Sequence, residues 1–476
     1  MFIARLKSNL FATVDGSFLS VFRIGFGVIM FLEVLRYWFN DWIRWLYIEP
    51  TFYFKYYGFE WIEPWPGDGM YYHFAVMGIL AIFISIGFLY RISTALFFLA
   101  FSYVFLLDQT RYLNHFYLVM LVSFLLIVAP AHRHFSIDAW LWPKLRSEQV
   151  PVWTLWILRA QFEILYIYAG IVKINPDWLN LEPLRMWLST RTDMPVFGYL
   201  YTQDWAIAVA AYGIIILHVI GAPLLLWKKT RLVIFIIYAC FHTLNHFTFN
   251  IGIFPWFTLF ATLVFFDPDW PKQLAGKVQA LFDKTGKIIA TGDQTGTNNG
   301  DTADDAGRSY MRSNALTQNG IIGFLAVWLL FQVLVPLRHL LYPGNVSWNE
   351  QGHRFAWQMK LRDKEGFADF AIVDPASGQS WYVEPERYLT RKQAKKMATQ
   401  PDMILQFAYY LEELWKQHYQ LDDVEVRVNN YVSLNGRHPA PMVNPSLDLT
   451  RIRRSFQAAD WILPLHEPLK RVTQNP

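Results

Sequence analysis

Six polar residues lie at the ends of apolar stretches long enough to cross a membrane, where they could do chemistry at its surface. They are Asn114, His115, Lys173, His242, Asn245 and His246. A lysine in this position either extends its amine to the membrane surface or holds it in a dry pocket, where a neutral amine is available as a base. Imidazole and amide groups accept protons and stabilise oxyanions. Each histidine alone has a structural interpretation, but their common position favours one site.

Two charged residues within the same apolar stretch as Lys173 have a structural interpretation. Arg159 and Glu163 are four residues apart, so on a helix they share a face and are predicted to pair with each other. His218, near the middle of another stretch, is also predicted to be structural. The chemistry is therefore expected from the residues at the ends of the stretches.

Other chemistries are not predicted. The histidines have no inner carboxylate at helical spacing beside them, so no metal is expected. Cys240 is the one cysteine, which excludes a disulfide within the chain and a multi-cysteine metal site. The sequence has no G-x-S-x-G, glycine-rich phosphate loop or H-E-x-x-H motif. With a net charge of +4 and no block of like charges, nucleic acid is not an expected partner.

The elements that position these residues are predicted to be membrane helices. The chain is 54% hydrophobic and 17% charged, whereas soluble domains have about 45–50% apolar and about 25% charged residues. The sequence predicts a polytopic α-helical membrane protein with about nine transmembrane helices. The apolar stretches cover residues 17–38, 72–89, 93–108, 114–130, 152–174, 205–227, 232–248, 250–267 and 320–341.

Lys and Arg in the short loops predict the orientation. Loops around 91, 133–146, 228–231 and 272–287 carry most of them, which places these loops and the N-terminus in the cytoplasm. Nine spans then leave the C-terminal domain outside, in the periplasm or extracellular space, or in the endoplasmic reticulum lumen of a eukaryote. In this topology the candidate residues lie near the outer surface, with His242 about one turn deeper.

The domain organisation follows from the hydropathy pattern. Residues 1–270 form a transmembrane domain with eight spans, 271–319 a flexible inner linker, 320–341 the last span and 342–476 an outer α+β domain. Alternating polar and apolar residues predict strands at 355–363, 367–374, 381–385 and 424–433, and helical spacing predicts a helix at 401–419.

Four long segments resemble the vitamin K-dependent γ-glutamyl carboxylases. They are YRISTALFFLAFSYVFLLDQTRYLNHFYL (90–118), LRAQFEILYIYAGIVKINPDWL (158–179), FHTLNHFTFNIGIFPW (241–256) and WYVEPERYLTRKQAKKMATQPDMILQFA (381–408). The second is similar to the family's A-G-x-x-K pattern followed by D-W, and the third to its F-H-x-x-N segment. The resemblance extends over roughly 10–270 and 320–470.

The resemblance implies an integral membrane enzyme that oxygenates vitamin K hydroquinone, of the menaquinone or phylloquinone type, to the epoxide. This oxidation drives removal of a γ-proton from a peptide glutamate, to which CO2 adds; CO2 and O2 are co-substrates. Lys173 aligns with the family's catalytic lysine, and His115 with a histidine that supports epoxidation. His242 and Asn245 align with residues lining the same cavity, beside Asn114 and His246.

The same resemblance implies the partners. A Glu-containing peptide arrives from the outer side, and the region Trp381–Arg391 holds its glutamate, with Trp381, Tyr382, Thr390 and Arg391 as binding residues. A quinone reductase would recycle the epoxide.

Departures from the family pattern leave alternatives open. The single cysteine cannot form the disulfide that joins the membrane and luminal parts of the animal enzymes. The chain is also shorter than those enzymes, which suggests a compact, bacterial-type homologue and puts propeptide recognition in question. One alternative is a quinol epoxidase that does not carboxylate. Another is a non-catalytic membrane protein that binds or transports quinone or lipid.

Overall fold

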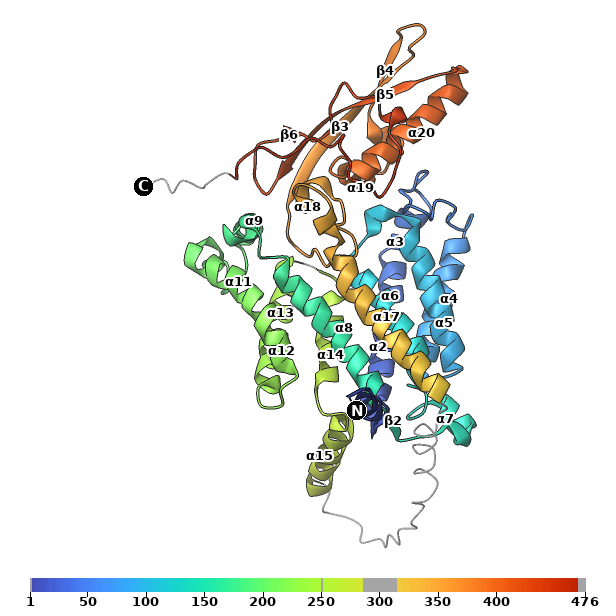
Figure 1. Cartoon of the computed structure of the whole chain (residues 1–476), viewed down its shortest axis with the longest axis vertical. Coiled ribbons are helices and arrows are strands. Elements are labelled where there is room, and N and C mark those ends of the chain that lie inside the picture. The colour runs from blue at the N-terminus through green and yellow to red at the C-terminus, as the bar shows by residue number, and fades with distance from the viewer. Residues whose placement is uncertain (1, 250, 286–314, 470–476) are drawn as a thin grey trace.

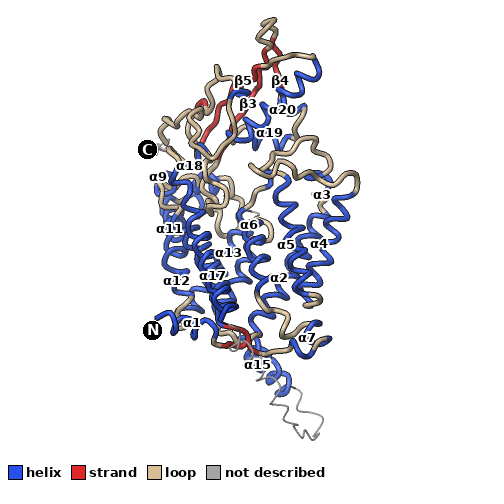
Figure 2. The backbone as a smooth tube through the Cα atoms, turned by 45° about the vertical axis from the view of Figure 1, so that its right-hand side comes forward, coloured by secondary structure: helices blue, strands red, loops and turns tan. Residues whose placement is uncertain are grey.

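A computed structural model describes residues 2–249, 251–285 and 315–469. The helices of the first 270 residues and α17 form a bundle, and the smaller C-terminal domain covers one end of it (Figure 1). The N-terminus lies at the opposite end of the bundle, as Figure 2 also shows. The residues predicted to do chemistry therefore have to be sought where the two parts meet.

The bundle and the outer domain are built from the following elements. The bundle contains α1 (Phe2–Phe11), β1 (Thr13–Asp15), α2 (Ser17–Phe39), α3 (Trp42–Tyr47), α4 (Gly69–Ile86), α5 (Tyr90–Leu107), α6 (Asn114–Val128), α7 (Ile137–Leu141), β2 (Gln149–Pro151), α8 (Val152–Ile171), α9 (Pro176–Leu179), α10 (Leu184–Ser189), α11 (Asp204–Ile216), α12 (Ala222–Leu225), α13 (Arg231–Phe249), α14 (Phe254–Thr262), α15 (Trp270–Thr285) and α17 (Ala315–Leu337). The outer domain contains α18 (Val346–Asn349), β3 (Lys364–Val373), β4 (Ser380–Val383), α19 (Arg391–Met397), α20 (Pro401–Tyr419), β5 (Glu425–Leu434) and β6 (Ala440–Pro441).

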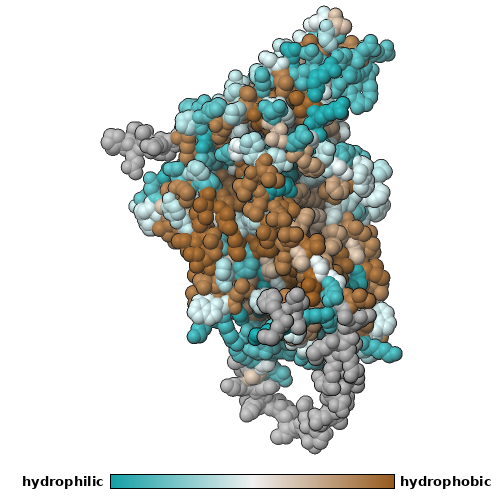
Figure 3. Space-filling model, in the orientation of Figure 1, coloured by the Kyte–Doolittle hydropathy of each residue, from teal (hydrophilic) through white to brown (hydrophobic). Residues whose placement is uncertain are grey.

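Six helical segments in the described part of the chain are long and apolar enough to cross a membrane. They are α2, α4, α5, the α11–α12 segment (Asp204–Leu225), α13 and the α17 segment (Leu316–Leu341). Two other predicted spans, at α6 and α14, are shorter apolar helices, and α8 carries Arg159 and Glu163. On the face shown in Figure 3, an apolar belt lies across the bundle between two polar ends. The structure thus describes a helical membrane protein, without confirming the nine spans predicted.

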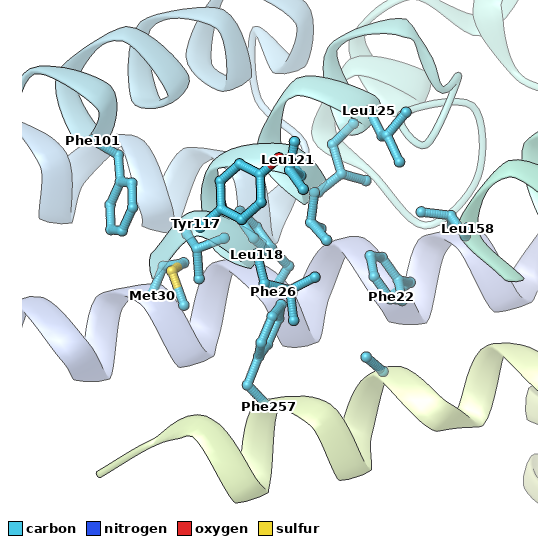
Figure 4. Packing of buried hydrophobic residues seen from close by; sticks show 14 of the residues in the cluster. Phe22, Phe26, Met30, Phe101, Tyr117, Leu118, Leu121, Leu125, Leu158 and Phe257 are labelled. Carbon is cyan, nitrogen blue, oxygen red and sulfur yellow. The ribbon is translucent and has the colours of Figure 1, made fainter. Parts of the chain in front are cut away.

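The bundle packs around α2, which is apolar on nearly every side. Figure 4 shows Phe22, Phe26 and Met30 of α2 among side chains from α6 and α14. The ring of Phe26 lies edge-on to Phe97 at 5.9 Å and to Phe257 at 6.2 Å between centroids. Aromatic pairs in this geometry add specific contacts to close packing. A rigid centre of this kind holds the helix ends that carry the candidate residues.

The outer domain is a four-stranded antiparallel sheet with two helices packed on it. The strand order is β4-β3-β5-β6, and Phe370 of β3 pairs with Val428 of β5. Phe370 also packs against Phe407 of α20 at 5.1 Å. The helix predicted at 401–419 coincides with α20, and the strands predicted at 367–374, 381–385 and 424–433 correspond to β3, β4 and β5.

The strand predicted at 355–363 is not formed, and this prediction was wrong. These residues belong to a loop, here called the insertion loop (residues 350–363), in which Phe355, Trp357 and Lys360 have positive φ angles. The Phe355 N–H donates to the Tyr112 hydroxyl at 2.7 Å, and the Trp357 ring lies 5.0 Å from that of Tyr117. Trp357 is fully buried and Phe355 is partly buried against the bundle, so the apolar alternation reflects docking between domains instead of a sheet.

The range predicted as a flexible inner linker begins with a helix. Helix α15 (Trp270–Thr285) occupies the first part of residues 271–319, and α17 begins at Ala315, before the predicted 320. Leu274, Val278 and Leu281 recur at helical spacing, which favours an amphipathic helix. Residues 286–314 of the predicted linker lie outside the described residues.

Candidate functional site

Two cavities lie where the outer domain meets the bundle. The lysine cavity, of about 90 Å³, is mostly apolar. Its lining includes Leu165, Tyr166, Ala169, Lys173, Trp178, His218, Phe241, His242 and Asn245. The basic cavity, of about 530 Å³, is lined by Asn114, His115 and many charged residues of the outer domain. Both cavities are bounded by Trp187, Ile251, Phe254, Met359 and Lys360, here called the shared wall.

Lys173 is held in the lysine cavity by the way α8 ends. The helix ends at Ile171, and Asn175 caps α9, which has Pro176 at its first position. This turn leaves Lys173 at the helix terminus with 5% of its surface exposed. Its Nζ atom donates to the carbonyl oxygens of Ala169 at 2.8 Å and Met359 at 3.2 Å.

No carboxylate partner accompanies the Lys173 amine among the described residues. It lies over the ring of Trp178, 5.2 Å from the centroid, and its two hydrogen bonds go to carbonyl oxygens. An ammonium in apolar surroundings without a counter-ion is costly, which favours the neutral amine. The residue therefore has the surroundings expected of a base instead of those of a lysine reaching into water.

Two histidines face the lysine cavity with Lys173. His242 Nδ1 lies 3.5 Å from the Thr258 hydroxyl, and its Nε2 is buried without a hydrogen-bond partner among the described residues. His218, predicted to be structural, also lines the cavity, with Nδ1 2.8 Å from the carbonyl of Ile214. It lies in a π-helical segment, Leu217–Gly221, a local irregularity often found at functional sites. The sequence pattern carried no sign of this irregularity.

Asn114 and His115 lie on the other side of the shared wall. His115 is buried near the start of α6, with its ring 5.5 Å from that of Phe254. Asn114 accepts from the Tyr112 hydroxyl at 3.0 Å and donates to the Gln358 carbonyl at 3.4 Å. His115 and Lys173 are thus neighbours across Phe254, each facing its own cavity.

The other predicted site residues are not brought to either cavity. His246 packs its ring against Trp256 at 5.1 Å. Trp381 and Tyr382 lie on the edge strand β4, with Tyr382 82% exposed. Thr390 caps α19, and Arg391 is exposed beside it. A glutamate held by these last four residues would lie apart from Lys173, and this assignment stays a prediction.

The basic cavity has an excess of positive charge that sequence reasoning missed. Six cationic side chains line it against three carboxylates: Arg354, Lys360, Arg362, Lys364, Lys395 and Lys396 against Glu350, Asp363 and Glu365. The alternation of the insertion loop predicts a strand, and that prediction draws no attention to the cations between its aromatic residues. Their density in HRFAWQMKLRDKE (353–365) was the available signal.

The carboxylates of this cavity already have partners. Glu350 is buried and pairs with Arg362 and with Lys364, the latter at 3.1 Å. Burial alone would raise the pKa of Glu350, but these cations outweigh that effect and hold it well below the usual range. Asp363 accepts from Trp187 Nε1 at 2.6 Å. Glu350 is thus neutralised by cations of the same cavity, whereas Asp363 is held by a neutral donor.

Three of these cations, Arg354, Lys360 and Lys396, form no ion pair within the described part of the chain, whereas the other three pair with Glu350 or Glu365. Burial, together with the charge of Arg362, lowers the pKa of Lys396 to about 8. A partly buried ammonium without a partner is suited to bind a carboxylate. The cavity therefore has the charge expected of a site for an acidic ligand.

The predicted pair of Arg159 and Glu163 is not formed, and this prediction was wrong. Arg159 donates to the carbonyls of Val264, Phe265 and Phe266 at 2.9–3.1 Å. These carbonyls follow the end of α14, where the backbone leaves acceptors unsatisfied. Both carboxylate oxygens of Glu163 are buried without a hydrogen-bond partner in the described structure.

Comparison with known protein families matches both parts of the chain. Residues 11–270 match the HTTM domain, and residues 317–468 match the lumenal domain of the vitamin K-dependent gamma-carboxylase. The chain belongs to the vitamin K-dependent γ-carboxylase family. No solved structure matches the chain. The family's lumenal domain is thus the part that supplies the insertion loop and the cations of the basic cavity.

Membership of the vitamin K-dependent γ-carboxylase family also indicates the type of ligand. The family's dependence on vitamin K implies vitamin K hydroquinone as the ligand. The lysine cavity offers an amine, an imidazole nitrogen without a hydrogen-bond partner among the described residues, and an amide between aromatic walls. These groups suit a flat, apolar ring that carries hydroxyl groups. Within the described residues, no group of three or more His, Cys, Asp or Glu is placed to hold a metal ion.

Proposed function

We propose that the protein is a γ-glutamyl carboxylase that couples oxygenation of vitamin K hydroquinone to carboxylation of a peptide glutamate by CO2. One observation carries this proposal. Lys173 is buried without a counter-ion in an apolar cavity, and that cavity shares a wall with a second one that is rich in cations. An apolar reductant and an acidic side chain can thus be bound next to each other.

Lys173 is proposed as the base that removes a proton from a hydroxyl group of the hydroquinone. Its carbonyl partners Ala169 and Met359 fix the position of the amine, and they accept hydrogen bonds without supplying charge. His242 Nε2 and the Asn245 amide face the same space and would orient the second hydroxyl group. Hydroquinone bound here would react with oxygen. That reaction would supply a base strong enough to remove the γ-proton of the glutamate.

The basic cavity is proposed to hold the substrate glutamate. Lys396 has no carboxylate partner among the described residues, and Arg354 donates to the side-chain oxygen of Gln400. Either can bind the substrate carboxylate and direct its γ-carbon toward the shared wall. His115 faces this cavity and would support oxygenation from the glutamate side. Trp381, Tyr382, Thr390 and Arg391 are retained as a proposal for the flanking peptide, because β4 is an exposed edge strand.

Each proposed ligand would reach its cavity from a different side of the molecule. An isoprenoid quinol partitions into lipid and would reach the lysine cavity from the bilayer, whereas the peptide would approach from the side of the outer domain. We place the N-terminus in the cytoplasm and the outer domain in the periplasm or extracellular space, or the lumen in a eukaryote. A quinone reductase that recycles the epoxide completes the proposed cycle.

The test uses purified protein in lipid nanodiscs with vitamin K hydroquinone, O2, labelled bicarbonate and a Glu-containing peptide. Epoxide and peptide-bound label are followed together, and we expect both from the wild type and neither from Lys173→Ala. Epoxide without label, for a range of peptides, would replace the proposal with a quinol epoxidase. Neither product from the wild type would favour a protein that only binds quinone or lipid.

A further inference from the structure

Lys360 carries a positive charge on the shared wall. Of the six cations that line the basic cavity in the described part of the chain, it alone also lines the lysine cavity. Its ammonium nitrogen lies 4.7 Å from the ring centroids of both Trp187 and Phe249. Aromatic faces attract a cation, and the charge of Asp363 opposes the lowering of the Lys360 pKa by burial. An anion bound in either cavity therefore meets this ammonium at the wall.

The position of Lys360 is fixed by both domains. The Met359 carbonyl before it accepts a hydrogen bond from the proposed base, and Leu361 after it is 4% exposed within an apolar cluster of the bundle. The two rings beside the ammonium come from α10 and α13. Trp187 is itself held by its hydrogen bond to Asp363 at 2.6 Å. The ammonium is thus placed by the same contacts that join the insertion loop to the bundle.

The basic cavity has more unpaired cations than one glutamate requires. Arg354, Lys360 and Lys396 form no ion pair within the described residues, whereas the substrate glutamate offers them one carboxylate. Carboxylation places a second carboxylate on the γ-carbon, and this carbon is proposed to face the shared wall. The wall carries Lys360 but neither of the other two cations. The charge of the cavity therefore suits the product, and the position of Lys360 suits the carboxylate that is newly formed.

We propose that Lys360 is a catalytic residue that stabilises the carboxylate formed from CO2 and then holds it in the product. This proposal rests on the proposed function, which supplies the γ-carbanion of the glutamate. The electron pair on the γ-carbon forms a bond to the carbon of CO2 as one C–O π bond breaks. Its electron pair moves to an oxygen, where the negative charge is stabilised by an N–H of the Lys360 ammonium. No proton is transferred in this step, and no oxidant is needed.

The ratio of labelled peptide to epoxide tests this role. Lys360→Met removes the charge and keeps an unbranched side chain. At low bicarbonate its rate of epoxide formation should stay close to that of the wild type, while the label per epoxide falls about tenfold or more, because one group that stabilises an oxyanion is lost. Lys360→Arg keeps the charge and should keep most of the label. The matched control is Lys395→Gln, which removes a lysine of the same cavity that is paired with Glu365; it should keep the wild-type ratio.

Hydrogen exchange at the γ-carbon shows at which step the variant fails. A γ-carbanion that CO2 does not capture takes a proton from solvent. In D2O, Lys360→Met should therefore introduce deuterium at the γ-carbon as the label is lost. Loss of the label without deuterium would place the defect before proton removal and would overturn the proposal.

The outcomes separate this proposal from the proposed function. A wild type that makes no epoxide defeats the function itself. An active wild type with the same label per epoxide in Lys360→Met overturns the role of Lys360 alone. Epoxide that falls as much as the label in Lys360→Met would assign the ammonium to the quinol and would also overturn the proposal.

A binding measurement tests the product contact without turnover. In the absence of hydroquinone, the wild type should bind a peptide that contains γ-carboxyglutamate about tenfold more tightly than the matching Glu peptide, because one more charge-assisted hydrogen bond is made. Lys360→Met should lose this preference and keep the affinity for the Glu peptide, whereas Lys395→Gln should retain both. Equal affinities of the wild type for the two peptides would contradict the assignment, and this result needs no variant.

Discussion

The Nζ atom of Lys173 donates a hydrogen bond to the carbonyl oxygen of Met359, a residue 186 positions further along the chain. The proposed base of the membrane domain is therefore positioned in part by the backbone of the outer domain. The insertion loop that carries Met359 also forms the wall between the two cavities. Removal or displacement of the outer domain should therefore affect the lysine as well as peptide binding.

Replacement of Lys173 tests the base. Lys173→Ala should abolish epoxide formation while hydroquinone binding and the melting temperature stay close to those of the wild type, because the amine makes only two hydrogen bonds to carbonyls. Epoxide formation by product analysis and hydroquinone affinity by fluorescence titration would be measured on the same preparation. Wild-type turnover by Lys173→Ala would remove this residue from the mechanism.

Replacement of His115 should have a smaller effect, since it faces the basic cavity across Phe254 and not the amine itself. We expect His115→Ala to lower the steady-state rate by about 10²–10⁴, the range for loss of one acid–base or oxyanion group. The control is His246→Ala, which packs on Trp256 outside both cavities and should keep most of its activity. Equal losses in the two variants would argue against a special role of His115.

The pH dependence of peptide binding should report Lys396. Its pKa is lowered to about 8 by burial and by Arg362, so the ammonium that would bind a carboxylate is lost as the pH rises through 8. The affinity for a Glu-containing peptide, measured without hydroquinone, should thus be constant near pH 7 and fall above pH 8. Lys396→Arg, which stays protonated, should remove this fall, whereas Tyr382→Ala on β4 should leave it. A pH-independent affinity in the wild type would exclude Lys396 from carboxylate binding.

The contact between the two domains contains a buried ion pair whose loss should be costly. Arg437 of the outer domain donates to both oxygens of Asp177 at 2.6 and 2.7 Å, and Asn435 donates to the same carboxylate at 2.7 Å. Asp177→Asn leaves the Arg437 guanidinium buried without its charge partner, a change that costs about 3–5 kcal/mol.

The melting temperature in nanodiscs measures this effect. Asp177→Asn should melt well below the wild type, and the double variant with Arg437→Gln should recover part of the loss because no charge remains buried. The exposed pair of Lys395 and Glu365 is the control, and Lys395→Gln should change stability little. An Asp177→Asn variant as stable as the wild type would contradict the assignment.

The sequence predicted well those elements that local periodicity decides. Helix α20 is amphipathic, and its predicted bounds, 401–419, agree with the structure. The insertion loop could not be predicted in the same way, because Phe355 and Trp357 pack against Tyr112 and Tyr117, more than 200 residues earlier in the chain. Alternation of apolar residues is the same whether the partner is a sheet or a helix bundle, and only the docked structure distinguishes them.

The candidate site was predicted in part for a similar reason. Lys173, His242 and Asn245 were recognised as costly polar residues at helix ends, and they face one cavity. The pairing of Arg159 with Glu163 failed because free carbonyls after α14 compete for the guanidinium. Spacing along one helix does not reveal acceptors that another helix provides. The same limit hid Lys396, whose role depends on which carboxylates lie near it.

The shared wall has a thermodynamic consequence for the two ligands. Met359 and Lys360 contact both cavities through one short segment that is not part of a helix or a strand. If binding of the proposed quinol shifts this segment and so changes the affinity for the proposed peptide, the peptide must change the affinity for quinol by the same factor. Oxygen activation would then be favoured only when an acceptor for the resulting base is already in place.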